Sequence, residues 1–261
     1  MHLNLHDAYH ITESWLHRTD PRAKLLATLL LILLIGLTPF GGFLSYAAYL
    51  VLLLIMALST HISPALLWRR ALLVLPFAGA AATVIFTVPG NPLGAPFLGL
   101  TITDAGLARF ASILLKAVAS AQVAVLLLAT TPFTDTLWAA SALRLPAVLV
   151  AIVSFMYRYL FVIADEALRL NRARLARSVE LPGQRSRRTD IGFQARTTGR
   201  LIGVLLVRSL ERSERVYNAM LARGYAGEIR RLAPPPVTAA TLTLPALTLL
   251  IGLAIFALAY V

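Results

Sequence analysis

Two arginines, each with small residues on both sides, are the clearest candidates for chemistry in this 261-residue chain. They lie in the blocks Ala176-Arg177-Ser178 and Ala222-Arg223-Gly224. A planar guanidinium makes bidentate, charge-assisted hydrogen bonds with a carboxylate, and small neighbours let a helix end enter a groove on a partner. The alternative for each block is an ordinary cationic helix end, which the helix macrodipole stabilises.

Four histidines and one lysine are further candidates. His2, His6 and His10 are four residues apart, which would place them on one face of a helix, and imidazole suits cobalt and nickel. For these residues and for His17 we favour an interfacial polar segment over a metal site. Lys116 lies in a long apolar run, where an ionisable residue is a functional candidate. A snorkelling or internally paired lysine explains it equally well.

Enzyme motifs are missing from the sequence. It contains no Gly-x-x-x-x-Gly-Lys-Ser/Thr phosphate-binding loop, so we do not expect the chain to hydrolyse ATP itself. It also has no His-Glu-x-x-His motif and no cysteine, which excludes thiolate ligands and cysteine nucleophiles. Asp165 and Glu166 are adjacent and do not share a helical face. We predict a non-catalytic chain with no cofactor-binding or metal-binding residues.

The composition predicts that these residues belong to a membrane protein. Hydrophobic residues make up 58% of the chain and charged residues 14%, whereas a soluble domain has about 45–50% and about 25%. A spanning helix needs about 20 mostly apolar residues. The candidate crossings are residues 25–40, 43–59, 71–88, 107–129 and 237–261.

Lysines and arginines orient these crossings, because they favour the cytoplasmic side. Basic residues precede the first crossing and separate the second from the third, namely Arg18, Arg22, Lys24, Arg69 and Arg70. A sixth apolar run, residues 145–164, carries Arg158, and if it crossed, the arginine-rich segment after it would lie outside. We therefore predict five crossings, with the N-terminus inside and the C-terminus outside. Six crossings with a rearranged parity are the alternative.

The arginine-rich segment, Asp165–Arg231, holds 15 of the 24 basic residues and seven of the 12 acidic residues. Charged and apolar residues interleave without glycine or proline from Met156 to Val179, which predicts a helix. Leu181-Pro182-Gly183 ends this helix, and residues 184–198 are predicted to be a polar link. A second helix is predicted from about Thr198 to Arg223, with Gly224 as the residue after its C-cap.

The second predicted helix is amphipathic. Its apolar residues recur at nearly helical spacing, at Leu206, Leu210, Tyr217 and Leu221. Glu211 and Arg215 are four residues apart and form a favourable pair on one face. This pattern and the seven acids favour a protein interface. Binding to nucleic acid or to anionic lipid is the alternative that the arginines permit.

Three blocks of the sequence resemble the T component of energy-coupling-factor transporters, of the cobalt/nickel type known as CbiQ. The blocks are Ser14–Leu26, Phe155–Leu160 and Arg208–Tyr225. The resemblance covers essentially the whole chain. It implies an all-α integral membrane protein with about five transmembrane helices and long cytoplasmic coupling helices in an L-shaped arrangement.

The resemblance also implies an organisation and a location. Transmembrane helices would occupy residues 1–130, the coupling-helix region residues 131–236, and a last transmembrane helix residues 237–261. The chain would be a multi-pass protein of the bacterial cytoplasmic (inner) membrane, in contact with its lipids and with no nucleic acid.

In that family, a membrane scaffold transmits motion from two ATP-binding-cassette ATPase subunits to a substrate-binding membrane subunit, the S subunit, which binds the metal. The coupling helices end in two Ala-Arg-Gly motifs whose arginines dock into the ATPases. Carried over, these arginines are Arg177 and Arg223. The second motif matches fully, whereas the first has Ser178 where glycine is usual. The implied cargo is cobalt, with nickel as the alternative, and a stand-alone secondary transporter is the less favoured hypothesis.

Overall fold

The computed structural model describes residues 14–60, 62–91, 102–177, 191–227 and 239–260. The regular elements in these ranges are helices, which confirms the predicted all-α class. The α-helices are α1 (Trp15–Arg18), α2 (Pro21–Leu37), α3 (Phe43–Ser59), α4 (Pro64–Ala71), α5 (Leu75–Ala81), α6 (Val84–Thr87), α7 (Asp104–Thr130), α8 (Phe133–Ala142), α9 (Ala147–Arg177), α10 (Ile191–Ala222) and α11 (Ala239–Ala257), and η1 (Leu72–Val74) and η3 (Leu258–Tyr260) are short 3-10 helices.

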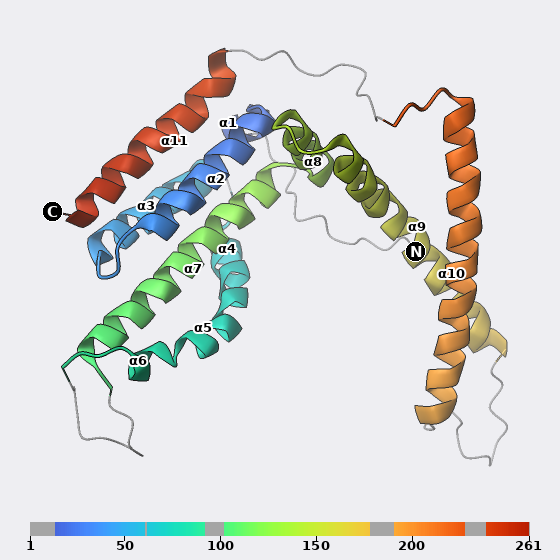
Figure 1. The fold of residues 1–261 in the computed structure, drawn as a ribbon, viewed down its shortest axis with the longest axis horizontal. Coiled ribbons are helices and arrows are strands. Elements are labelled where there is room, and N and C mark those ends of the chain that lie inside the picture. The colour runs from blue at the N-terminus through green and yellow to red at the C-terminus, as the bar shows by residue number, and fades with distance from the viewer. Residues whose placement is uncertain (1–13, 61, 92–101, 178–190, 228–238, 261) are drawn as a thin grey trace. The chain divides into compact units, whose positions relative to one another are not determined.

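The described helices fall into two compact units (Figure 1). One unit contains α1–α8 and α11, and we call it the membrane unit. The other contains α9 and α10, and we call it the helix-pair unit. Helix α8 packs against α2, so it belongs with the membrane unit although it follows residue 130.

The start of α2 and its turn into α3 follow from local sequence. The Asp20 side chain caps α2 by accepting a hydrogen bond from the backbone N–H of Arg22 at 2.9 Å, and Pro21 occupies the first turn. Gly41, in the turn between α2 and α3, has a φ of 90°, a conformation that glycine adopts without a steric penalty. These two local motifs set the start of α2 and the turn that leads into α3.

Helix α11 packs closely along α2 and is hydrogen-bonded to α3. A Cβ atom on Gly252 would lie 2.5 Å from Cδ1 of Leu34, so a larger residue there would require the Leu34 side chain to move. The hydroxyl groups of Tyr49 and Ser45 donate to the backbone oxygens of Gly252 and Ile255, at 3.0 and 2.9 Å. These contacts join the C-terminal helix to residues some 200 positions earlier.

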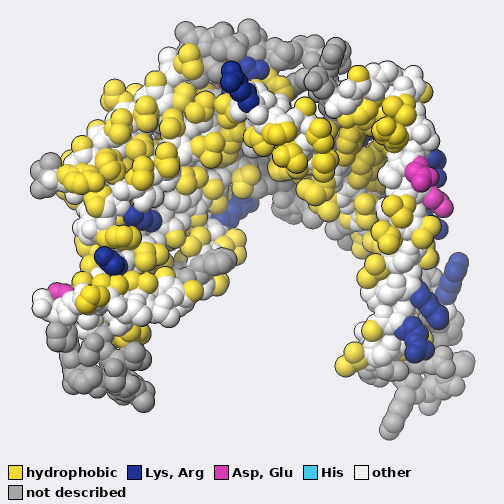
Figure 2. All heavy atoms as spheres, viewed as in Figure 1, with side chains coloured by type: hydrophobic (Ala, Val, Ile, Leu, Met, Phe, Trp, Pro, Cys, Tyr) yellow, Lys and Arg dark blue, Asp and Glu magenta, His cyan; other side chains and the backbone are white. Residues whose placement is uncertain are grey.

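Apolar side chains from α2, α3 and α7 form the core of the membrane unit. One buried cluster consists of Leu31, Ile35, Tyr49, Leu53, Ala119 and Val123. A second lies nearer the other end of α3 and α7, includes residues of α1 and α4, and consists of Leu16, Ala57, Ile62, Leu67, Leu126 and Ala129. Hydrophobic side chains also cover most of the visible surface of this unit (Figure 2), as expected for helices that face lipid.

The third predicted crossing, residues 71–88, is not one continuous helix. The structure divides this stretch into the end of α4, η1, α5 and α6. The helical pieces 64–74 and 79–87 are bent by 53° relative to each other. Pro76 lies in the first turn of α5, where proline cannot donate the backbone hydrogen bond that would continue the preceding helix. A helical period alone does not reveal such a break.

Three of the described helical segments are long and apolar enough to cross a membrane: α7, α9 and residues 242–260. The bent pair would make a fourth, and α2 and α3 are apolar helices of 17 residues each. The chain is therefore an integral membrane protein. The number of crossings, their orientation and the L-shaped arrangement stay predictions.

The helix-pair unit differs from the predicted boundaries in two places. Helix α9 is a single helix of 31 residues, which joins the apolar run 145–164 to the charged helix that follows it. Helix α10 has 32 residues and begins at Ile191, so the prediction of a polar link up to residue 198 was wrong. Its first turns are almost entirely exposed. A helix without a buried face shows no apolar period, and the polar composition was therefore misleading.

Candidate functional site

The C-terminal end of α10 holds Arg223 in a well-defined backbone motif. Gly224 has a φ of 79°. Its N–H donates to the carbonyl oxygen of Leu221 at 2.9 Å, and the N–H of Tyr225 donates to that of Met220 at 3.0 Å. This pair of hydrogen bonds is a Schellman motif. The predicted role of Gly224 is confirmed. The motif fixes the backbone of Arg223 between the last helical turn and Gly224.

Both candidate arginines are exposed at the ends of long helices. Arg177 is the last residue of α9, and Arg223 directly follows α10. Among the described residues, neither guanidinium lies within ion-pair distance of a carboxylate. Ala176 and Ala222 are exposed beside them, whereas Ser178 lies outside the described residues. Arg177 and Arg223 are therefore open to a partner carboxylate from another chain.

The apolar face that the sequence predicts on α10 is a surface stripe. Leu206, Leu210, Tyr217 and Leu221 are between 48% and 60% exposed. The residues of α10 that face α9 lie on a neighbouring stripe and are half-buried, namely Leu205, Ser209, Arg212, Val216 and Met220. We call the first set the exposed stripe of α10. Apart from Tyr217, which also borders the space between α9 and α10, the described part of the helix pair leaves this stripe uncovered.

An open cavity of about 420 Å³ lies between α9 and α10. Phe155 and Tyr159 line it from α9, and Tyr217 and Met220 from α10. Tyr225, which closes the Schellman motif, lines it as well. The two helices cross each other (Figure 1), and the cavity lies between their aromatic side chains.

Lys116 has an internal partner in the membrane unit. Its Nζ donates to the carbonyl oxygen of Gly36 on α2 at 2.9 Å and lies 4.5 Å from the centre of the Phe40 ring. The guanidinium of Arg109 lies 5.5 Å from the same ring centre. This geometry corresponds to the internally paired lysine of the two alternatives, and a functional role of Lys116 stays a prediction.

The histidines show no metal-binding arrangement in the part of the chain that the structure describes. His2, His6 and His10 lie outside it. His17 Nδ1 is 2.6 Å from Oγ of Ser14, which is buried at the start of α1. Within the described ranges, no three His, Cys, Asp or Glu side chains are grouped so that they could hold a metal ion.

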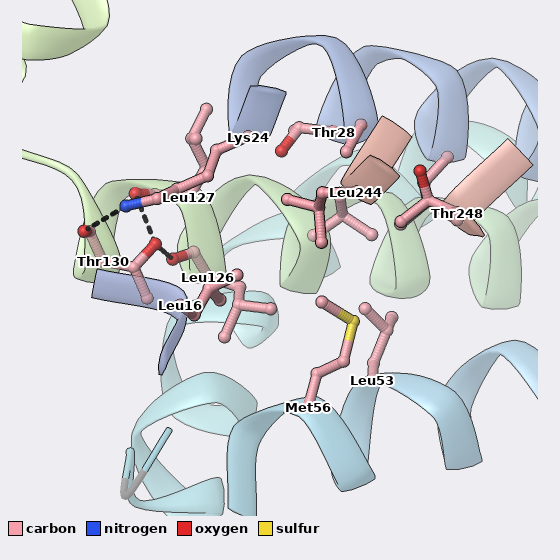
Figure 3. A pocket seen from close by; sticks show the side chains of 13 residues that line it. Leu16, Lys24, Thr28, Leu53, Met56, Leu126, Leu127, Thr130, Leu244 and Thr248 are labelled. Carbon is pink, nitrogen blue, oxygen red and sulfur yellow. Dashed lines mark hydrogen bonds between the residues drawn. The ribbon is translucent and has the colours of Figure 1, made fainter. Parts of the chain in front are cut away.

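Two basic residues that the sequence analysis used to orient the crossings make contacts inside the membrane unit. Lys24, which Figure 3 shows beside Thr130, is 5% exposed and donates to Thr130 O at 3.1 Å. It also donates to Thr131 Oγ1 at 3.3 Å. The guanidinium of Arg22 lies 4.2 Å from the ring centre of Trp138 on α8. No local pattern pointed to either contact, since their partners lie more than 100 residues away.

Comparison with known proteins identifies the family. The family model described as cobalt transport protein, CbiQ, matches residues 12–235. The chain is 31% identical over 247 residues to the cobalt transport protein CbiQ of Rhodobacter capsulatus, which covers 91% of this chain and 93% of that protein. It is 28% identical over 225 residues to an uncharacterized protein of Methanocaldococcus jannaschii, which covers 83% and 73%.

These matches cover residues of both units of the fold. A single family model spans most of the membrane unit and all of the described helix pair. The chain therefore belongs to the CbiQ family of cobalt transport proteins, the T components of energy-coupling-factor transporters, and it is a membrane protein with a role in cobalt transport.

Proposed function

We propose that this chain is the transmembrane scaffold of an ATP-driven importer of cobalt ions. It would couple the closure of two ATP-binding-cassette ATPase subunits to a membrane S subunit that binds the metal. The observation that carries this proposal is the end of α10. There Arg223 is exposed, has no carboxylate partner among the described residues and is held by a Schellman motif.

The proposed mechanism uses α9 and α10 as levers. With 31 and 32 residues, they are each about 45–50 Å long at 1.5 Å per residue. ATP binding brings the two ATPases together, and Arg177 and Arg223, bound to acidic residues of the ATPases, follow them. The helix pair tilts, and the S subunit releases its cobalt ion on the inner side. Such coupling requires an element with two arrangements, of which the nucleotide favours one.

The exposed stripe of α10 is the surface that we assign to a membrane partner. Exposed leucine and tyrosine side chains that recur along one face of a helix indicate an interaction site. Its residues Leu206 to Leu221 lie along the same helix as Arg223. One rigid helix would then carry both an ATPase contact and a contact to the S subunit, which gives a direct route for the motion.

The membrane topology is part of the same proposal. We assign residues 1–130 to transmembrane helices, 131–236 to the coupling region and 237–261 to the last crossing of the bacterial inner membrane. The N-terminus lies inside and the C-terminus outside. The 15 basic residues of Asp165–Arg231 support a cytoplasmic coupling region, because arginine is retained on that side.

The substitution Arg223→Glu tests the proposal. It places a carboxylate where a partner carboxylate is expected, so the ATPases should no longer co-purify and ATP-driven cobalt uptake should be lost, while the chain still inserts. The matched control is Arg215→Glu on the same helix, whose guanidinium is exposed and 3.9 Å from Glu211. Normal co-purification of an active ATPase with Arg223→Glu would overturn the proposal.

Two further measurements separate the alternatives. Competition between cobalt and nickel in uptake by the complete transporter identifies the preferred cargo, which the S subunit selects. Uptake by this chain alone in proteoliposomes, without ATPase, would instead favour a stand-alone secondary transporter.

A further inference from the structure

A single carboxylate joins the two helices of the helix-pair unit. Glu166 of α9 accepts from Arg208 Nη1 at 2.6 Å through Oε1 and from Arg212 Nη2 at 3.1 Å through Oε2. Arg169, one turn further along α9, has its Nη2 3.8 Å from Oε2. The Glu166 side chain is 16% exposed, whereas the three arginines are 38–64% exposed. One acid is thus surrounded by three cations.

Apolar packing contributes little to holding these two helices together. Ala151 is the buried residue of α9, and α10 has none among its described residues. Beside the Glu166 contact lies the open cavity of about 420 Å³, so the interface is not filled there. Isolated surface ion pairs are worth little, but charge-assisted hydrogen bonds from two arginines to one carboxylate form a network, which is stronger. Where buried apolar contacts are few, the Glu166 network determines how α9 and α10 are arranged.

Loss of the Glu166 carboxylate would leave its arginine partners facing one another. Arg208 and Arg212 are four residues apart, so they lie on one face of α10 and both point to the same carboxylate. Without that carboxylate, the two α10 guanidiniums would face Arg169 of α9 with no counter-charge. Like charges repel each other, so α9 and α10 would separate at this contact.

We infer that Glu166 is the positioning residue that fixes the crossing of α9 and α10. Through this contact the two helix ends move as one body. The inference rests on the proposed function, because it explains how displacement of one bound helix end reaches the other helix. A pair of helices that pivoted freely at their contact would absorb the motion of the ATPases without passing it on.

The first test is Glu166→Gln in the complete transporter. The helix ends with Arg177 and Arg223 are unchanged, so the ATPases should still co-purify and hydrolyse ATP. Cobalt uptake per ATP hydrolysed should fall at least about fivefold, the lower end of typical coupling between sites. Glu211→Gln is the matched control, because Glu211 is an exposed acid of α10 that pairs within its own helix.

The outcomes separate this inference from the proposed function. If the unmodified chain does not bind ATPases, the proposed function fails. If the unmodified transporter works and Glu166→Gln retains full uptake per ATP, the positioning role fails. Loss of ATPase binding by Glu166→Gln would also overturn the inference, because Glu166 would then serve docking or folding instead.

A covalent link provides a second and independent test. The chain has no cysteine, so Glu166→Cys combined with Arg212→Cys gives one thiol pair that a short bis-maleimide can join in the assembled transporter. Before linking, uptake per ATP should be low, as in Glu166→Gln. After linking, it should recover, since α9 and α10 again move as one body. A linked transporter that remains inactive would show that the helices must move relative to each other, and the inference would be wrong.

Discussion

The Nζ atom of Lys24 lies 3.1 Å from the backbone carbonyl oxygen of Thr130, which is 106 residues further along the chain. This contact joins the first turn of α2 to the last residue of α7. The carbonyl groups at the end of a helix lack intrahelical partners and carry partial negative charge. A buried ammonium at this point therefore satisfies α7 and holds α2 against it.

We expect Lys24→Met to lower the thermal stability of the chain in detergent. Methionine retains most of the apolar volume, but it leaves Thr130 O without its partner, which costs about 1–3 kcal/mol for a buried group. Part of this cost is offset because a charge is no longer buried. Thr131→Val, which removes only the weaker 3.3 Å acceptor, should have a smaller effect. Equal melting temperatures for Lys24→Met and the unmodified chain would contradict this interpretation.

Lys116→Met should affect stability more than transport. The Nζ of Lys116 donates to Gly36 O and contacts the Phe40 ring, which are contacts within the membrane unit. A single hydrogen bond from a charged group contributes about 1.5–3 kcal/mol. We expect a lower melting temperature and cobalt uptake within about twofold of normal at a permissive temperature. Complete loss of uptake by a well-folded variant would instead assign Lys116 a functional role.

Gly224→Ala and Gly203→Ala should change the stability of α10 in opposite directions. At a φ of 79°, Gly224 is in a left-handed conformation that costs an alanine about 1–2 kcal/mol. Gly203 lies within the helix with open space around it, and alanine is favoured there by up to about 1 kcal/mol. Hydrogen exchange of the last turn of α10 measures the first effect, and exchange of the turns around Gly203 measures the second. ATPase binding should weaken only in Gly224→Ala, because that variant loosens the backbone of Arg223.

The contact of Glu166 with α10 should be lost in acid. The hydrogen bond from Arg208 lowers the pKa of the Glu166 carboxyl, partial burial opposes this shift, and the charges of Arg208, Arg169 and Arg212 add to the lowering. A lowered pKa means that the carboxylate stabilises the helix pair fully above the ordinary glutamate pKa of about 4.3. This stabilisation disappears as the pH falls below that value through the lowered pKa.

Spin labels on α9 and α10 measure this pH dependence. Cysteines replacing Leu168 and Leu206, both exposed, provide the labelling sites. The label distance should be constant at neutral pH and increase only in acid. In the Glu166→Gln background it should already be large at pH 7 and should not change. A distance that increases at the same pH in both backgrounds would assign the change to another group.

Much of the site follows from local sequence. The cap at Asp20, the turn at Gly41 and the helix end at Gly224 each depend on a few neighbouring residues whose backbone preferences are strong. The arginine at the end of α10 was predicted for the same reason. The family of the chain was predicted from short sequence blocks, and the family match over residues 12–235 confirmed it.

Other features depend on contacts between distant residues, and the sequence alone missed them. Glu166 was set aside because it shares no helical face with Asp165, yet its partners lie 42 and 46 residues further along the chain. The exposed stripe of α10 has the correct helical period, but a period does not say whether a face is covered by another helix. The break near Pro76 has a local cause, but it lies inside an apolar run that hydropathy alone reports as continuous.

The amino-acid sequence by itself determined the class of the protein, its apolar segments and the ends of its helices. These properties arise from hydropathy and from backbone preferences that act over a few residues. Only the tertiary structure decided which cations are paired with a carboxylate, as Arg208 and Arg212 are with Glu166, and which stay available, as Arg223 does. The reason is physical, because charge pairing depends on distance in space, and distance along the chain does not determine it.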